Sequence, residues 1–293
     1  MNNRQALLAS LLIFALARGC AESAPYTLPA PNFGGAFGAS ANPTSMIIIT
    51  DYGAIAQSAF TPDGAYVGFE STNSMLIPVT AHSQIFMKET RPDFKTYRLA
   101  SSIDGTILTQ GIEDSFGPHI SADARFVEFA SKSINMVFGA SGRQIYVRDL
   151  NATSDSFKLA SSADGTILTA SNGDCYNPYL SPDGMWAVFN CTGATNLVTG
   201  ATGDQVYRKK LIPISTPPDL VSSTDGKSTG IGNAVSKEPF ISGNGTYVVF
   251  TSTATNLVTG YTGATGVSQI YLKNMANSVI TLISSKDGTV DNR

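Results

Sequence analysis

A series of residue types recurs along this chain about every 60 residues. Each copy holds a Ser-x-Asp-Gly type of turn, an aromatic-rich strand, a polar loop and a strand opened by Gln, and it closes with Ser-Ser-x-Asp-Gly. The turn residues, the Gln residues and the first Ser of each closure are Asp63, Asp123, Asp183 and Asn244; Gln84, Gln144, Gln205 and Gln269; Ser101, Ser161, Ser222 and Ser284. Such a period predicts a repeat architecture, in which one unit cannot bury its own apolar face and stacks on its neighbours.

The composition predicts a folded all-β chain. Of 293 residues, 42% are apolar and 14% are charged, which fits a large core rather than disorder. Val, Ile, Thr, Tyr and Phe cluster in short runs between Gly, Asp, Asn and Ser turns. The net charge of -3 and the scattered Lys and Arg residues offer no basic surface, so we expect no nucleic-acid partner.

Residues 1–24 have the pattern of an export signal, with a positive charge at Arg4, an apolar run at 6–17 and then small residues. The run is too short to favour a membrane span. Two cleavage patterns compete: Ala-Leu-Ala at 15–17 suits ordinary signal peptidase, whereas residues 16–20 resemble a bacterial lipobox in which Cys20 carries the lipid. Arg18 departs from the lipobox pattern. We favour the lipoprotein type, and the alternative is that Cys20 belongs to a discarded peptide.

The rest of the chain divides into a tether and a repeat domain. Residues 25–45 are rich in Pro, Gly, Ala, Ser and Asn without periodicity, which predicts a flexible tether. The repeat domain spans 46–293. It begins with an orphan strand at 46–53, which is similar to the fourth strand of the later units. Four units of about 60 residues follow, at 54–113, 114–173, 174–234 and 235–293.

The second strand of each unit carries apolar residues on both faces. In the third unit Trp186 alternates with Ala187, and Phe189 follows. A strand that is buried on both faces lies in a sheet packed between other sheets. The sequence therefore predicts a β-propeller of four-stranded blades preceded by the orphan strand. A small closed ring, an open arc and half of a larger assembly all remain open.

The Ser-Pro-Asp-Gly turn at 181–184 before an aromatic-rich strand, and the Ala-Thr-Asn-Leu-Val-Thr-Gly runs at 194–200 and 254–260, carry a family resemblance. These motifs resemble the WD40-like (PD40) β-propeller repeats of TolB-type proteins of the bacterial envelope. The resemblance covers residues 54–293, although the units are longer than compact propeller blades. It implies a role in recognition, and it does not imply the partner.

Two cysteines replace serines at partnered positions of one unit. Cys175 and Cys191 stand where the second unit has Ser115 and Ser131 and the fourth has Ser236 and Ser252. If Ser181 faces Met185 across the tight turn, the antiparallel register places these two cysteines opposite each other. The sequence predicts a disulfide there, with two buried thiols as the alternative. Pairing also leaves Cys20 free for modification.

We predict no catalytic residue, metal ion or cofactor. The two histidines, His82 and His119, lie in different units without further His or Cys nearby, and zinc needs three or four such ligands. The sequence contains no G-x-S-x-G elbow, Walker loop or H-E-x-x-H motif. The repeated turn acids are expected to form turns.

The longest predicted loops are the second-to-third and the blade-to-blade connections. Because strands alternate in direction, both classes emerge on one face, named here the long-loop face. Non-repeated polar residues there are candidates for contact with a partner: His82, Lys132, Arg143, Asp204 and Tyr261.

The sequence favours an exported, lipid-anchored β-propeller without enzymatic activity. It would bind a protein or polymer partner of the bacterial cell envelope through the long-loop face, as an outer-membrane lipoprotein or a periplasmic protein. One alternative is a propeller-fold hydrolase acting on glycans or peptides, and another is a truncated or decayed propeller. An open ring would also permit self-association.

Overall fold

The computed structural model describes residues 60–285, apart from 73–75, 77–81, 92–96, 105, 107–108, 138–139, 153–156, 215 and 262–264. The chain divides into two compact units, Met1–Ser40 and Ala41–Arg293, and the described residues lie in the second. The expected export signal at 1–24 with Cys20, the tether at 25–45 and the orphan strand at 46–53 lie outside the described residues.

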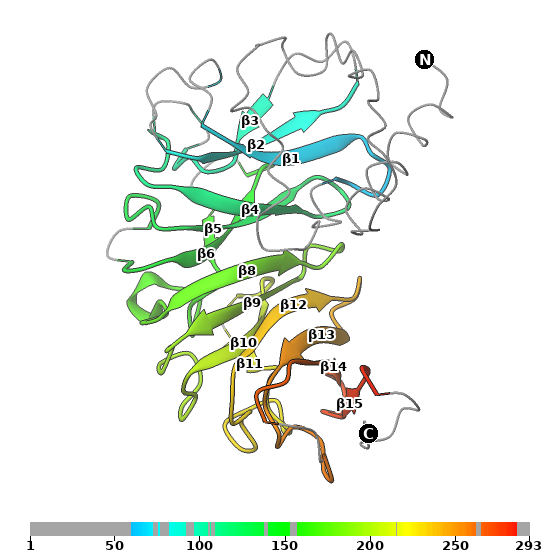
Figure 1. The fold of residues 1–293 in the computed structure, drawn as a ribbon. Helices are drawn as coiled ribbons and strands as arrows, with labels where there is room; N and C mark the ends of the chain where they lie inside the picture. The colour runs from blue at the N-terminus through cyan, green and yellow to red at the C-terminus, as the bar shows by residue number, and fades with distance from the viewer. Residues whose placement is uncertain are drawn as a thin grey trace, which may run out of the picture. The chain divides into compact units, whose positions relative to one another are not determined.

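Four antiparallel sheets follow one another along the chain, and in each the strands pair in sequence order (Figure 1). The sheets are β1 (Tyr66–Ser71), β2 (Gln84–Glu89) and β3 (Tyr97–Leu99); β4 (Ser115–Ile120), β5 (Phe126–Ser131), β6 (Gln144–Asp149) and β7 (Phe157–Leu159); β8 (Asp174–Leu180), β9 (Trp186–Thr192), β10 (Asp204–Lys210) and β11 (Asp219–Leu220); β12 (Ser236–Ile241), β13 (Tyr247–Ser252), β14 (Gln269–Asn274) and β15 (Ile280–Leu282). A short 3-10 turn, η3 (Ile167–Thr169), lies between the second and third sheets. The expectation of all-β, propeller-type blades is confirmed.

Within the described residues the first sheet has three strands, β1 to β3, and residues 54–59, where its expected first strand lies, are outside that part of the chain. Phe60 nevertheless forms an isolated antiparallel bridge with Val67. In the second sheet, Ile120 pairs with Val127 at the equivalent position. Phe60 thus holds, in the first sheet, the position that Ile120 holds in the second.

The apolar core lies between the sheets. In β5, Val127 and Phe129 join a cluster with Ile85 of the first sheet, whereas Phe126 joins a cluster with Phe189 of the third. A third cluster joins the third and fourth sheets. The prediction that the second strand is buried on both faces is confirmed in β5, all of whose residues are buried.

A second kind of contact between sheets uses a buried cation of the third strand. Lys209 and Lys273 are fully buried, and Arg148 is nearly so. Each donates to backbone carbonyls of the Ser-Ser-x-Asp-Gly closure in the preceding sheet. Those contacts are Arg148 with the carbonyls of Ser102 and Ile103, Lys209 with that of Ala163 at 3.0 Å, and Lys273 with those of Ser223 at 2.7 Å and Thr224 at 3.2 Å.

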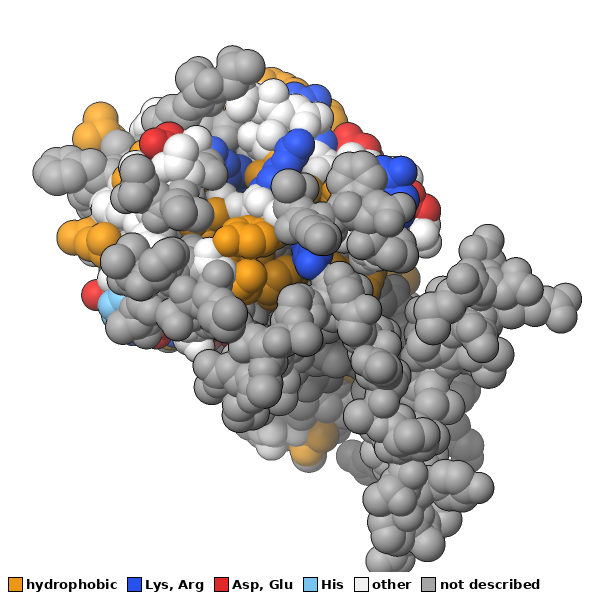
Figure 2. Space-filling view, turned by 90° about the horizontal axis from the view of Figure 1, so that it is seen from above, with side chains coloured by type: hydrophobic (Ala, Val, Ile, Leu, Met, Phe, Trp, Pro, Cys, Tyr) orange, Lys and Arg blue, Asp and Glu red, His pale blue; other side chains and the backbone are white. Residues whose placement is uncertain are grey.

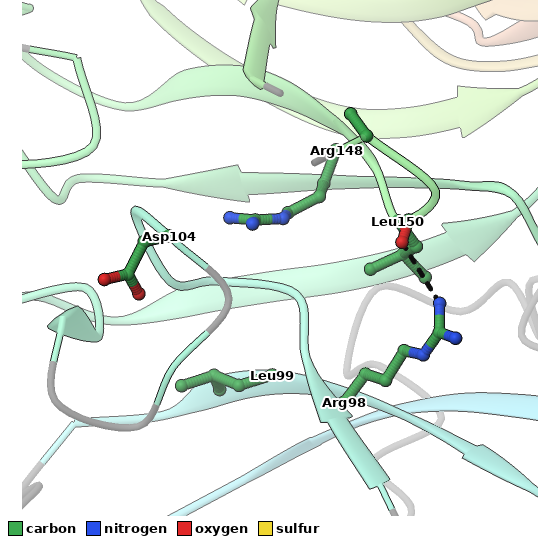
Figure 3. Close-up of a pocket in the computed structure, with 6 residues that line it drawn as sticks. Arg98, Leu99, Asp104, Arg148 and Leu150 are labelled. Atoms are coloured by element: carbon green, nitrogen blue, oxygen red, sulfur yellow. Dashed lines mark hydrogen bonds between the residues drawn. The ribbon is translucent and has the colours of Figure 1, made fainter. Parts of the chain in front are cut away.

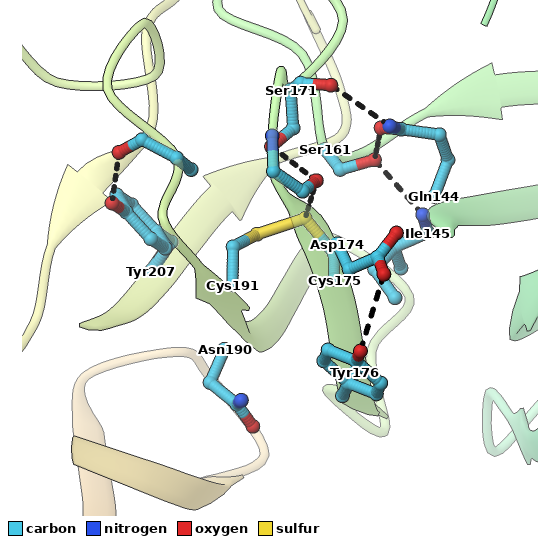
Figure 4. Close-up of a disulfide and its surroundings, with 12 residues drawn as sticks. Gln144, Ile145, Ser161, Ser171, Asp174, Cys175, Tyr176, Asn190, Cys191 and Tyr207 are labelled. Carbon is cyan, nitrogen blue, oxygen red and sulfur yellow. Dashed lines mark hydrogen bonds between the residues drawn. A yellow bond between two sulfur atoms is a disulfide. The ribbon is translucent and has the colours of Figure 1, made fainter. Parts of the chain in front are cut away.

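The repeated Gln ties each closure to its own sheet (Figure 4). Gln144 accepts a hydrogen bond from Ser161 Oγ at 2.6 Å and donates to the carbonyl of Ser171 at 2.9 Å. Ser161 Oγ in turn accepts the Ile145 N–H at 2.9 Å. Gln84 and Gln205 repeat this arrangement in the first and third sheets. The residue is therefore part of the scaffold in each repeat.

The long second-to-third loops are also partly scaffold. Asn196 Nδ2 donates to the carbonyl of Ala170 at 2.7 Å, and its Oδ1 accepts the N–H of Asn172 at 3.0 Å. Leu197 of the same loop is buried in the core between sheets. Asn135 and Asn256 clamp their preceding blade-to-blade loops in the same way. Loop length alone therefore does not identify residues that contact a partner.

The outer face of the fourth sheet is more exposed than the equivalent face of the third. Ile270 of β14 is 43% exposed, whereas Val206, its counterpart in β10, is fully buried against the fourth sheet. Among the described residues, each cluster that spans two sheets joins consecutive ones, and none joins the fourth sheet to the first. Figure 2 looks from the β1–β3 end, where apolar side chains gather beside Lys and Arg side chains.

A disulfide joins Cys175 of β8 to Cys191 of β9, with Cα atoms 4.0 Å apart (Figure 4). The sequence analysis placed Ser181 opposite Met185 across the turn, and this was wrong by one residue. Ser181 donates its N–H to the carbonyl of Trp186. A β-bulge between Tyr176 and Tyr179 adds one residue to β8 and brings the cysteines back into register.

The other sheets place a pair of serines at the same site. Ser115 Oγ lies 3.0 Å from Ser131 Oγ, and Ser236 Oγ lies 2.8 Å from Ser252 Oγ. A hydroxyl pair and a disulfide thus connect the same two strands in neighbouring sheets, so the fold does not require the covalent bond.

We predict that the double variant Cys175→Ser with Cys191→Ser folds but loses about 2 kcal/mol of stability. Closing a loop of this size accounts for about 3 kcal/mol, and the new hydroxyl pair restores about 1 kcal/mol. Urea unfolding of the oxidised protein measures the difference, with Ser115→Ala and Ser131→Ala as the matched control in the second sheet. Two free thiols at 175 and 191 in protein from an oxidising compartment would contradict the account.

Candidate functional site

The five residues predicted to face a partner lie at corresponding ends of their sheets but do not form one cluster. His82, Arg143 and Asp204 stand at or just before the first residue of a third strand, and Lys132 follows β5. Lys132 is exposed. Tyr261 instead packs against the core between the third and fourth sheets, and its hydroxyl is buried. The structure therefore favours a scaffold role for Tyr261.

His82 and Asp114 form a pair across the junction of the first and second sheets. His82 Nδ1 lies 3.5 Å from Asp114 Oδ1, and both side chains are about half exposed. The same carboxylate oxygen accepts the N–H of Ser83 at 2.7 Å. Asp114 thus fixes the start of β2, and His82 lies where solvent can reach it.

Arg143 occupies the corresponding junction of the second and third sheets. Its guanidinium carbon lies 4.9 Å from the ring centre of Phe116 and 4.5 Å from that of Tyr176. Phe116 and Tyr176 hold equivalent positions in the innermost strands β4 and β8. The side chain is therefore held between two aromatic rings from adjacent sheets, an arrangement that favours the cation electrostatically.

Asp174 supports this arrangement without pairing with the guanidinium. Its Oδ1 accepts the N–H of Arg143 at 2.6 Å, and its Oδ2 accepts the hydroxyl of Tyr176 at 3.3 Å (Figure 4). Gly142 has a φ of 68°, and a Cβ there would lie 2.5 Å from Asp174 Oδ1. Glycine at this position therefore lets the carboxylate approach the backbone.

The innermost strands contain a feature that the sequence analysis missed. Gly117, Asn177 and Glu238 have positive φ values of 59°, 49° and 54°, and each precedes a proline within a β-bulge. The residue after that proline carries a ring, and the three rings form a ladder from sheet to sheet. His119 lies 4.5 Å from Tyr179, and Tyr179 lies 4.9 Å from Phe240. In the sequence, the recurrence of a proline followed by a residue with a ring was the signal that could have predicted this ladder.

Two buried carboxyl groups accompany this ladder. Glu70 accepts the N–H of Gly117 at 3.2 Å, and burial raises its pKa to about 6. Glu128 is fully buried opposite His119, and both its oxygens lack a hydrogen-bond partner. Burial raises the pKa of Glu128 well above its usual value and lowers the pKa of His119 to about 3. Both groups therefore favour their neutral forms inside the fold.

A pocket of about 250 Å³ lies between the first and second sheets (Figure 3). Its lining includes Arg98, Asp104 and Arg148. Arg98 donates to the carbonyl of Leu150 at 3.1 Å, and hydrogen bonds from Thr109 and Thr106 lower the pKa of Asp104 to about 2. The carboxyl group of Asp104 is therefore ionised at neutral pH and is a poor proton donor there.

The described residues contain neither a cluster of metal ligands nor a membrane-spanning helix. Within them, no group of three His, Cys, Asp or Glu side chains is placed to hold a metal ion. In the same part of the chain, no helix has the length and apolar character needed to span a membrane.

Comparison with known proteins gives structural matches only. No family model matches the chain, and no curated protein matches it. TolB from Acinetobacter baumannii is 18% identical with a TM-score of 0.40, over 70% of this chain and 38% of that one. A putative TolB from Agrobacterium tumefaciens is 16% identical with a TM-score of 0.42, over 76% and 64%. An oligogalacturonate lyase from Vibrio parahaemolyticus is 13% identical with a TM-score of 0.44, over 77% and 50%. The matched region thus spans less than two thirds of each of these structures.

We predict that Glu128→Gln stabilises the protein at pH 8 and has no stabilising effect at pH 4. The pKa of Glu128 is higher in the folded chain than in the unfolded one. The stability that its protonated form contributes is therefore fully present below about pH 4.5 and is lost as the pH rises. Gln keeps the shape of the protonated acid and removes this loss. Urea unfolding at pH 4, 6 and 8 measures the difference.

The exposed Glu113 supplies the control, and Glu113→Gln should change stability little at any of these pH values. An equal effect of Glu128→Gln at pH 4 and pH 8 would contradict the burial of an ionisable carboxyl group.

Proposed function

We propose that this protein is a non-enzymatic β-propeller-type scaffold that binds a protein or polymer of the bacterial cell envelope through its long-loop face. The observation that carries the proposal is the pair of junction sites on that face. At one, His82 meets Asp114, and at the next, Arg143 lies between two aromatic rings. Each site combines residues from two adjacent sheets, so recognition depends on the stacked array rather than on one loop.

The long-loop face suits recognition better than catalysis. On that face the carboxylate of Asp114 is engaged by the N–H of Ser83, and the guanidinium of Arg143 lies against two aromatic rings. A hydrolase would need an acid and a base that both reach one substrate. Non-enzymatic binding requires only accessible groups in fixed positions.

The alternative, a propeller-fold hydrolase, has one observation in its favour. Glu70 has a pKa of about 6, which suits a general acid near neutral pH. Its side chain is buried and accepts a backbone hydrogen bond, so a substrate would have to displace Gly117 from it. Hydrolysis of glycan or peptide substrates that is lost in Glu70→Gln would favour this alternative.

Export and anchoring remain proposals that rest on the sequence alone. The export signal at 1–24 with Cys20 as the lipid attachment site would hold the protein at a membrane, and the tether at 25–45 would separate the repeat domain from it. Absence of labelled palmitate at Cys20 in cells would remove the anchor and leave a periplasmic protein.

Self-association also remains a proposal. The outer face of the fourth sheet exposes Tyr247 and Ile270 at positions whose counterparts in the third sheet pack against the next sheet. Since that packing recurs through the chain, we propose a second copy as the occupant of this face. A single monomeric species in sedimentation velocity at tens of micromolar would exclude it.

We predict that residues 26–293 recover a defined partner from envelope extract, and that charge reversal on the long-loop face reduces the recovery at least about tenfold. The test variants are Lys132→Glu and Arg143→Glu. Lys210→Glu is the control, because Lys210 ends β10 at the opposite side of the sheet from Asp204. Equal recovery of the same partner by test and control variants would remove the binding-face proposal.

A further inference from the structure

Four arginines of the described residues lie over aromatic rings, and one of them differs from the rest. Arg125 lies over Phe126, Arg148 over Phe157, Arg208 over Trp186, and Arg143 over both Phe116 and Tyr176. Stacking on rings holds the guanidinium plane in a fixed orientation. The four arginines differ in the hydrogen-bond acceptors of their guanidinium groups.

Three of these arginines are satisfied within the fold. Arg125 makes a bidentate pair with Asp149, its Nη2 lying 2.7 Å from Oδ2. Arg208 pairs with Asp219 at 2.5 Å and donates to the carbonyl of Gly245 at 2.6 Å. Arg148 donates to the carbonyls of the first-sheet closure. All three guanidinium groups therefore stabilise the scaffold.

Arg143 has no such acceptor among the described residues. Its Nε is buried without a hydrogen-bond partner, and none of the ion pairs in that part of the chain includes its guanidinium. The residue is partly exposed and lies on the long-loop face. A buried N–H without an acceptor costs free energy, because the group has lost its water without regaining a hydrogen bond.

We propose that Arg143 is an anchor for a carboxylate of the partner, to which its guanidinium, placed against the rings of Phe116 and Tyr176, donates hydrogen bonds. A guanidinium matches a carboxylate with two parallel N–H···O bonds, and the fixed plane lowers the ordering cost of forming them. This inference rests on the proposed function and specifies the chemistry of its partner. Asp174 holds the backbone of Arg143 and the hydroxyl of Tyr176, so it acts as a positioning residue.

The charges around Arg143 favour a protein partner with one acidic group over a polyanionic polymer. The same rim carries the carboxylates of Glu113, Asp114, Asp174 and Asp204, and the chain as a whole has a net charge of -3. A densely charged polymer would be repelled by these groups, whereas a single Asp, Glu or C-terminal carboxylate needs only the one guanidinium. The flanking rings would also contact an apolar side chain beside that carboxylate.

The test is an NMR titration of purified full-length protein that is uniformly labelled with ¹⁵N. This labelling makes both the arginine Nε–H groups and the backbone amides visible. N-acetylphenylalanine is the probe, since it joins one carboxylate to one ring, and its carboxamide is the neutral match. We expect the acid to shift the Nε–H signal of Arg143 and the amide signals of Phe116 and Tyr176 in a saturable way. The carboxamide should leave these signals unchanged, and this contrast does not depend on any variant.

Substitutions then assign the effect. Arg143→Gln should weaken binding of the probe about tenfold or more, as loss of a charge-assisted hydrogen bond would, and Arg143→Lys should weaken it less. Arg125→Gln is the matched control, because Arg125 is also stacked but already paired with Asp149, and it should bind the probe like wild type. Thermal unfolding of each variant identifies any loss that comes from misfolding.

Three results would overturn the inference: no shift with the acid, equal shifts with acid and carboxamide, or undiminished binding by Arg143→Gln. A third probe, inorganic polyphosphate, tests whether the ligand is instead a polyanionic polymer. Tighter binding of polyphosphate than of the single carboxylate at the same signals would reject the protein partner. Failure of the probe together with unchanged recovery of a partner from extract would reject the anchor and leave the proposed function standing.

Discussion

The contact on which this structure depends is the packing of one sheet against the next. Val127 and Phe129 of β5 face the first sheet, while Phe126 and Ala130 face the third. Each fully buried Val, Leu or Phe side chain contributes about 1.5–3 kcal/mol, and one sheet alone would leave half of them in water. No sheet can therefore be stable by itself, and the repeat is a consequence of that shared core.

Polar contacts fix the spacing and order of the sheets. Lys209 and Lys273 each insert an ammonium group among carbonyls of the preceding closure, and burial lowers the pKa of both to about 8. Both groups therefore still favour the charged form at neutral pH. Arg143 is an exception to this pattern. Its guanidinium lies over aromatic rings like those of other arginines of the fold, but it has no hydrogen-bond acceptor among the described residues. The difference separates the scaffold cations from the one that we propose as an anchor for a partner.

The sequence predicted the repeat, the antiparallel sheets and the double burial of the second strand, because all three follow from local periodicity. It did not predict the positive-φ residues Gly117, Asn177 and Glu238, since a bulge depends on pairing across strands. That bulge also corrected the register beside Cys175, where the turn alone gave a wrong premise. Arg143 was selected as a polar residue on the long-loop face, but its two aromatic neighbours come from different sheets and are about 27 and 33 residues away in sequence. The packing of Tyr261 against the core between the third and fourth sheets was likewise not visible in the sequence, because it depends on how the loop folds.

Native-state hydrogen exchange with Lys209→Met tests the central claim most directly. Lys209 lies on β10 and donates to the second sheet, so its loss should lower the protection of amides in β5 and β6 as well as in β9 and β10. The account predicts that the second and third sheets share one free energy of opening. The variant should lower that free energy by the same amount in both sheets. Unchanged protection of β5 and β6, with loss confined to β9 and β10, would contradict a core shared between sheets.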